Sequence, residues 1–205
     1  EVFLIDTQRN SRSLLSSSPG LNANPAFSPT RDEIALTLSK DGNPEIYLID
    51  LNDRSRTRLT DDRSVDSSPA WSPDGNRIAF VSNRSGSPQI YVMDRDGGGL
   101  RRLTFRGSYN TTPAWSPRGD LIAYQTIAGR EFQICTVNVD NGEIDTITSD
   151  SRNNEDPSWA PDGRHITYTS TSGRRSAVFI VDIFDKNPIQ LPDMKANVLN
   201  PDWSR

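Results

Sequence analysis

The sequence predicts an all-β protein that forms most of a β-propeller, and three observations on its 205 residues support this prediction. A 44-residue unit recurs in three separate registers without insertion or deletion, and repeats of this length are typical of propellers and solenoids. Each copy holds four short apolar runs separated by turns rich in Gly, Pro, Asn and Asp. The composition is 33% hydrophobic and 24% charged, and the apolar residues fall in short runs that recur along the chain.

The first register is a Pro–Ala–aromatic–Ser–Pro motif, with small changes in the later copies. Its leading prolines are Pro25, Pro69, Pro113, Pro157 and Pro201. The second register is an apolar run that ends in Asp or Asn, at residues 2–6, 46–50, 90–94, 134–138 and 178–182. The third is an aliphatic residue at Leu15, Leu59, Leu103, Ile147 and Leu191. Chance does not keep three registers in step over five copies.

One copy shows how the four strands arise. We expect strands a, b, c and d at residues 68–72, 77–82, 89–94 and 100–104. The turn after strand a is Pro73-Asp74-Gly75, in which Pro sets φ and Gly is free to take a positive φ. Strand b is continuously apolar at its centre, which suits a strand that is covered on both faces. Four short antiparallel strands per copy are typical of a propeller blade.

The aromatic residue of the first motif is expected at the interface between blades. Burial of one such ring is worth roughly 2–3 kcal/mol. These residues are Phe27, Trp71, Trp115, Trp159 and Trp203. The single cysteine, Cys135, occupies the repeat position of two tyrosines and is expected to be a small core residue. The single histidine, His165, is expected at the surface.

Counting strands indicates an incomplete ring. We expect a partial blade at 1–24, blades at 25–68, 69–112, 113–156 and 157–200, and a closing strand at 201–205. This arrangement fits a fragment of a six-bladed ring. Because an incomplete ring leaves strand edges unpaired, we also expect the chain to self-associate.

Several function classes are disfavoured. The net charge is −4 and no basic cluster is present, so we expect no nucleic-acid partner. No run of 18 apolar residues occurs, so we expect no membrane insertion. The sequence has no Gly-x-Ser-x-Gly elbow, no phosphate-binding loop and no zinc-ligand pattern. The segment 94–97 resembles only the start of a calcium loop. We therefore expect no catalytic residues, no cofactor and no metal.

The segments that join strand d to the next strand a are the candidate binding site. They cover residues 22–24, 65–68, 109–112, 153–156 and 198–200, and all lead into the innermost strand. They should therefore surround one mouth of the central channel, where small polar groups can capture an extended peptide or a partner loop. The candidate partner-binding residues are Asn22, Asn24, Asp66, Ser67, Ser68, Asn110, Thr111, Thr112, Asn154, Glu155, Asp156 and Asn200.

Residues 69–82, with the run 90–94, resemble the propeller repeat of the TolB family, and so do residues 35–42 with 46–50. The resemblance covers essentially the whole chain, and it implies that an α/β domain and the first blade and a half of the propeller, which the family has, are not among these 205 residues. It implies a six-bladed propeller in the Gram-negative periplasm. It also implies binding of the lipoprotein Pal at the channel mouth, and coupling to the other Tol proteins of the cell envelope.

Two other functions remain open from the residues alone. Similar repeats occur in the propellers of prolyl oligopeptidase-like and tricorn-like peptidases, where the propeller filters substrates for a separate catalytic domain. A stand-alone propeller that binds a peptide or a sugar is the other alternative.

Overall fold

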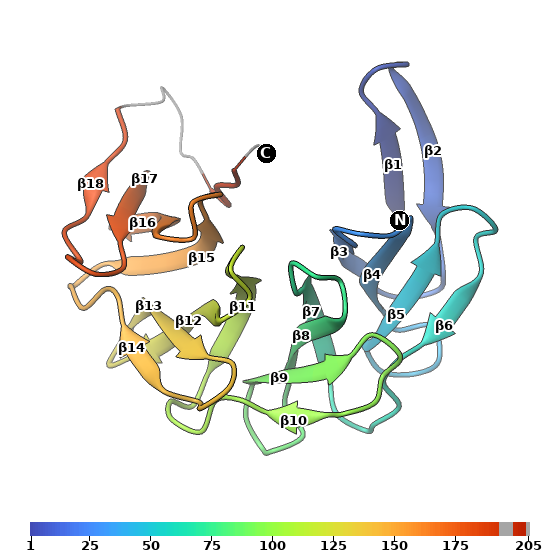
Figure 1. The fold of residues 1–205 in the computed structure, drawn as a ribbon, viewed down its shortest axis with the longest axis horizontal. Coiled ribbons are helices and arrows are strands. Elements are labelled where there is room, and N and C mark those ends of the chain that lie inside the picture. The colour runs from blue at the N-terminus through green and yellow to red at the C-terminus, as the bar shows by residue number, and fades with distance from the viewer. Residues whose placement is uncertain (193–198, 204–205) are drawn as a thin grey trace.

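The computed structural model describes residues 1–192 and 199–203 of the chain. It contains eighteen β-strands, and the described ranges hold no helix. The strands form four four-stranded antiparallel sheets and one two-stranded sheet. These sheets follow one another along an arc around a common interior (Figure 1). The prediction of an all-β partial propeller is confirmed.

Each four-stranded sheet is one blade with its strands in chain order. Blade 1 comprises β3 (Asn22–Phe27), β4 (Glu33–Leu38), β5 (Glu45–Asp50) and β6 (Arg56–Arg58). Blade 2 comprises β7 (Asp66–Trp71), β8 (Arg77–Ser82), β9 (Gln89–Asp94) and β10 (Arg101–Arg102). Blade 3 comprises β11 (Asn110–Trp115), β12 (Leu121–Ala128), β13 (Glu131–Asn138) and β14 (Ile144–Thr146). Blade 4 comprises β15 (Asn153–Trp159), β16 (His165–Ser172), β17 (Arg175–Asp182) and β18 (Ile189–Gln190).

The first strand of each blade lies on the inner side of the arc and the last lies on the outer side (Figure 1). The sheets start at residues 22, 66, 110 and 153, whereas we expected blades from 25, 69, 113 and 157. The earlier start has a physical reason: a β-bulge in each first strand keeps the polar residues before the proline in the sheet. Residues that we expected in loops are therefore strand residues.

The N-terminal hairpin, β1 (Val2–Asp6) and β2 (Ser11–Ser16), supplies two strands of a further blade. It packs on blade 1 through Val2 and Leu15, which contact the cluster that contains Ile34 and Tyr47. These two strands fall inside the range 1–24 that we expected to be a partial blade.

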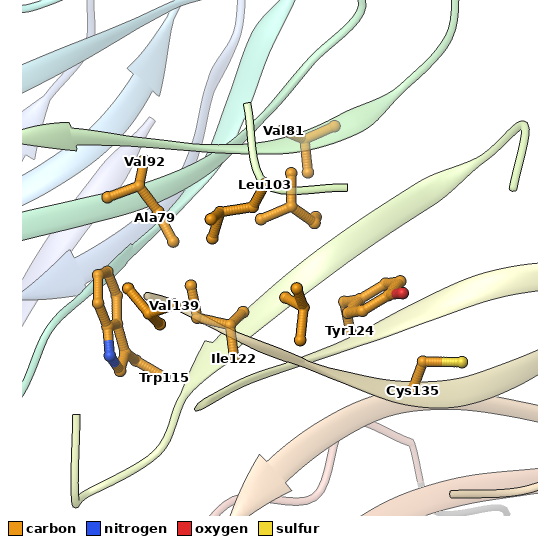
Figure 2. Close-up of a cluster of buried hydrophobic side chains, with 11 residues drawn as sticks. Ala79, Val81, Val92, Leu103, Trp115, Ile122, Tyr124, Cys135 and Val139 are labelled. Atoms are coloured by element: carbon orange, nitrogen blue, oxygen red, sulfur yellow. The ribbon is translucent and has the colours of Figure 1, made fainter. Parts of the chain in front are cut away.

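The core consists of thin layers, each shared by two neighbouring blades. Between blades 2 and 3, Ala79, Val92 and Leu103 meet Trp115 and Ile122 (Figure 2). Equivalent layers lie between blades 1 and 2 and between blades 3 and 4. Cys135 belongs to the layer in Figure 2 and is buried, as expected.

The aromatic motif residue lies at the blade interface in three copies but not in the first. Trp71, Trp115 and Trp159 are 6–8% exposed, which confirms the prediction for them. The indole of Trp71 also donates a hydrogen bond across the interface to the Ala26 carbonyl (3.1 Å). Phe27 is 62% exposed, so the prediction is wrong there. The hairpin brings no inner strand that could cover this ring.

The closing segment differs from the strand that we expected at 201–205. Residues 201–203 are not in a strand, because no second strand of a following blade pairs with them in the described chain. Side-chain contacts hold this segment against blade 4, including a hydrogen bond from Ser158 Oγ to Asp202 Oδ1 (2.8 Å). Ser204 and Arg205, the end of the expected closing strand, lie outside the described residues, as does Val198 of the last candidate loop.

Candidate functional site

The inner strands β3, β7, β11 and β15, together with residues 200–203, line a central channel of about 900 Å³. The same repeat positions contribute in every copy. The first residue that each copy adds to the channel wall is polar: Asn24, Ser68, Thr112, Asp156 or Asn200. The proline that follows and the aromatic residue two positions later also line the wall. The channel wall is therefore lined by five copies of one short sequence motif.

Four of these polar residues sit at the β-bulge of an inner strand, and Asn200 holds the equivalent position just before the closing segment. Their φ angles are all positive, between 50° and 54°. Asn and Asp tolerate this conformation better than other non-glycine residues, and they fill three of the five positions. The strand register shifts at each bulge, as between Ser67 and Ala70. The bulge separates the polar residue from its sheet ladder and aligns it with the channel wall.

Side chains of the preceding blade hold three of these five positions in place. The Ser68 amide donates to Thr37 Oγ1 (3.2 Å), and the Asp156 amide donates to Gln125 Oε1 (3.0 Å). The Asn200 amide donates to Thr169 Oγ1 (3.2 Å). For Thr112, the residue of the preceding blade that is equivalent to Thr37, Gln125 and Thr169 is Val81, whose side chain cannot accept a hydrogen bond. These bonds couple the shape of the channel wall to the packing of neighbouring blades.

Five of the twelve candidate residues therefore line the channel, namely Asn24, Ser68, Thr112, Asp156 and Asn200. Asp66, Asn110 and Asn154 are fully buried instead. Asn22, Ser67, Thr111 and Glu155 are partly buried strand residues beside the bulges. The role of all twelve residues in binding a partner stays a prediction.

The buried candidates belong to a network that joins each blade to the next. Asn110 Nδ2 donates to Gln89 Oε1 (2.8 Å), and Thr104 Oγ1 donates to the same oxygen (2.8 Å). One repeat further, Asn154 Nδ2 donates to Gln133 Oε1 (3.0 Å). Because these polar groups are buried, their hydrogen bonds are needed for folding. Their burial explains the polar sequence at the start of each inner strand.

The channel wall carries negative charge. Asp156 and Asp202 are its charged residues, and no Lys, Arg or His lines it among the described residues. Burial raises the pKa of Asp156 above its ordinary value. Burial also raises the pKa of Glu155, and the neighbouring charge of Asp156 adds to this effect.

The residues considered for chemistry lie elsewhere. His165 is partly exposed at the start of β16, just after the turn that joins β15 to β16, and its Nδ1 is 2.6 Å from Asp162 Oδ2. In residues 1–192 and 199–203, no three His, Cys, Asp or Glu side chains gather as a metal-binding set. The described part of the chain also has no helix with the length and hydrophobicity to span a membrane.

Sequence reasoning missed the prolines and the aromatic edges as wall residues. Pro69, Pro113 and Pro157 line the channel directly after the bulge residues. Their signal was present in the first repeat register, which we interpreted only as a blade-interface motif. The position of that motif on the innermost strand could have placed it in the channel.

These features define a partial β-propeller with an open channel lined by a repeated bulge–proline motif. The family profile of the TolB beta propeller domain matches residues 1–205, and the chain belongs to this family.

One solved structure agrees with this assignment, and a second shares the fold. TolB from Acinetobacter baumannii is 34% identical, with a TM-score of 0.87, over 98% of this chain and 50% of that one. The chain thus spans about half the length of that TolB. A protein described as TolB from Agrobacterium tumefaciens is 20% identical, with a TM-score of 0.70, over 91% of this chain and 86% of that one.

A puromycin-hydrolyzing peptidase from Mycobacterium tuberculosis has a TM-score of 0.69 at 14% identity, over 87% of this chain and 30% of that one. This likeness shows the fold alone. No curated protein matches the chain.

Proposed function

We propose that the chain is a non-enzymatic protein-interaction scaffold of the Tol-Pal cell-envelope system in the Gram-negative periplasm. Its partner is the lipoprotein Pal, which binds at the channel mouth, and other Tol proteins connect through the same assembly. The observation that carries the proposal is the open channel, which equivalent polar residues at 24, 68, 112, 156 and 200 line, the first four of them on inner strands. Membership of the TolB family supports the choice of partner.

The geometry suits recognition of a partner loop. The wall offers side-chain hydrogen-bonding groups between prolines and aromatic edges, which is a common composition for peptide recognition. Three of the five wall positions, Ser68, Asp156 and Asn200, are hydrogen-bonded through their amides to the preceding blade, so a partner meets a wall that is partly ordered in advance. Such a wall avoids part of the entropy loss on binding.

A substrate-filtering propeller of a peptidase is the second candidate, and the fold likeness to the mycobacterial peptidase is what favours it. The 34% identity to a TolB protein over nearly the whole chain weighs toward the scaffold.

Isothermal titration with the periplasmic domain of Pal tests the proposal. Ser68→Asn and Thr112→Asn enlarge two wall side chains but keep a residue type that tolerates the positive φ. Each should weaken binding by about tenfold, as expected for a disturbed contact at the centre of an interface. Asp140→Asn, an exposed change in the turn between β13 and β14, is the matched control and should leave the affinity unchanged. Unchanged affinity in both wall variants would exclude the channel as the Pal site.

A further inference from the structure

Blade 3 departs from the repeat on the face where the inner strands begin. Phe105, Ile127 and Phe132 are apolar residues of the d-to-a segment and of the hairpin between β12 and β13. Their counterparts in blades 1, 2 and 4 are polar residues or proline. They are Ser17, Asp61 and Ser149 for Phe105; Ser39, Asn83 and Thr171 for Ile127; and Pro44, Pro88 and Ser176 for Phe132. The blade fold therefore does not require apolar side chains at these positions.

Ile127 and Phe132 lie together with Tyr109, and Phe105 belongs to the same d-to-a segment as Tyr109, with the Arg102 guanidinium over the Phe105 ring. The rings of Tyr109 and Phe132 meet edge to face with centroids 5.9 Å apart. Ile127 pairs with Phe132 across the hairpin, and its amide donates to the Tyr109 carbonyl (3.3 Å). Phe105 is 71% exposed and Tyr109 40% exposed. Exposed apolar groups that gather in this way mark interaction sites more often than scattered ones do.

The surface also carries positive charge. Arg106 and Arg130 are exposed at the tips of the same two segments, and neither forms an ion pair within the described residues. Two other arginines of this face are neutralised, because Arg84 pairs with Asp66 and Arg152 pairs with Asp150. Arg174 and Arg175, at the tip of the blade 4 hairpin, are also without an ion pair in the described residues, but no apolar cluster lies beside them in the repeat. We name the six residues Phe105, Arg106, Tyr109, Ile127, Arg130 and Phe132 the blade 3 platform.

We propose that the blade 3 platform is a docking surface for an acidic protein segment that carries an aromatic or aliphatic anchor. The apolar side chains take the anchor, and the two arginines attract the acidic residues beside it. Aromatic residues and arginine are the residue types enriched at protein interfaces, and complementary charge fixes the orientation of the partner. The platform lies outside the residues that line the channel, so it is a second contact that does not depend on what the channel binds.

Charge favours a peptide over a nucleic acid as the occupant. Binding to nucleic acid draws its affinity from many phosphate contacts. The platform offers two unpaired cations on a chain whose net charge is −4, which would repel a long polyanion. A short acidic segment makes local contacts with the platform and avoids most of this repulsion.

Selection of a phage library of random short peptides on the whole 205-residue chain tests the inference. The platform variant combines Phe105→Ser, Ile127→Thr and Phe132→Ser, which are the residues that blade 4 carries at these positions, on a hairpin with strands of the same length. It should therefore fold, and circular dichroism checks this. Arg106→Gln with Arg130→Gln removes the charge alone. Arg174→Gln with Arg175→Gln, at the tip of the blade 4 hairpin, is the matched control.

We expect selected peptides to combine Asp or Glu with Trp, Phe or Leu. Their affinity, measured by fluorescence anisotropy, should fall at least about tenfold in the platform variant and in the Arg106/Arg130 variant, but not in the control. Higher salt should weaken them further. Neutral or basic selected peptides, equal affinity for the platform variant, or equal losses in the two arginine variants would overturn the inference. Tighter binding of an oligothymidylate at the platform would assign it to nucleic acid instead.

Discussion

Replacement of Asp66 by Asn should stabilise the protein near neutral pH and leave its stability almost unchanged in acid. The junction between blades 1 and 2 holds two buried acids, Glu45 and Asp66, where the later junctions hold the amide pairs Gln89–Asn110 and Gln133–Asn154. In the amide pairs the Asn donates a hydrogen bond that an ionised Asp cannot donate. The Oδ1 atom is buried without a hydrogen-bond partner in Asp66, Asn110 and Asn154 alike, so the junctions differ in the missing donor and not in an unpaired oxygen.

The sign of the pH dependence follows from the pKa of Asp66. Burial raises it, and the charge of Glu45 adds to the shift, whereas bonds from Ser82 and Arg84 oppose it. The folded state therefore holds the proton more tightly than the unfolded state. Through Asp66, the free energy of unfolding falls as pH rises from the ordinary aspartate range through the raised pKa. Asp66→Asn removes this fall in the free energy of unfolding, because an amide does not ionise.

The gain at neutral pH should be about 1 kcal/mol, the net worth of one buried hydrogen bond. Loss of the ion pair with Arg84 (2.6 Å) reduces the gain only partly. An amide oxygen still accepts from the guanidinium, which also lies over the rings of Phe80 and Tyr91. Urea unfolding followed by tryptophan fluorescence from about pH 4 to about pH 8 measures the difference between variant and wild type.

Asn110→Asp is the reciprocal control. It places a carboxylate beside Gln89, where Ala128 stands at the repeat position of Arg84, and should cost about 2 kcal/mol at neutral pH. If Asp66→Asn instead lost stability near neutral pH, the ion pair with Arg84 would outweigh the hydrogen bond that Asn can donate. The comparison between junctions would then be refuted.

Three further predictions concern the blade interfaces. Trp115→Ala should lower the free energy of unfolding in urea by about 3–5 kcal/mol because the ring is buried. Phe27→Ala should lower it by less than about 0.5 kcal/mol because that ring is exposed. Similar losses of stability in the two variants would contradict the interface assignment. Thr37→Val removes the acceptor for the Ser68 amide and should cost about 1 kcal/mol in the same assay, and no change would show that this bond does not hold the bulge. The chain should self-associate through its open end, so sedimentation velocity should show larger species at higher concentration and fewer of them in Phe27→Ser; one monomeric species throughout would contradict this.

Much of the fold could be predicted because a propeller repeats its local rules. Apolar runs of the second register became β5, β9, β13 and β17, and the turn signals separated them correctly. The starts of the inner strands could not be predicted in this way. Their polar residues lack the alternation of a half-buried strand, because Asn110 and its counterparts satisfy side chains 21 residues away in the chain.

The candidate site was predicted only in part for the same reason. The spacing of 44 residues brought Asn24, Ser68, Thr112, Asp156 and Asn200 to the channel, but it could not separate them from buried neighbours two residues away. That separation depends on the bulge, which changes the direction of the side chains within one strand. Phe27 shows a second limit, since the burial of a repeat position depends on the neighbouring copy.

The central claim, that the channel wall binds a protein partner, is tested most directly by an amide NMR titration with the periplasmic domain of Pal. The account predicts that the signals of Ser68, Thr112 and Asp156 shift or broaden together as the domain is added, while the signal of Asp140 stays in place. Saturable binding that moves other amides and leaves these three unchanged would contradict it, as would the absence of any shift.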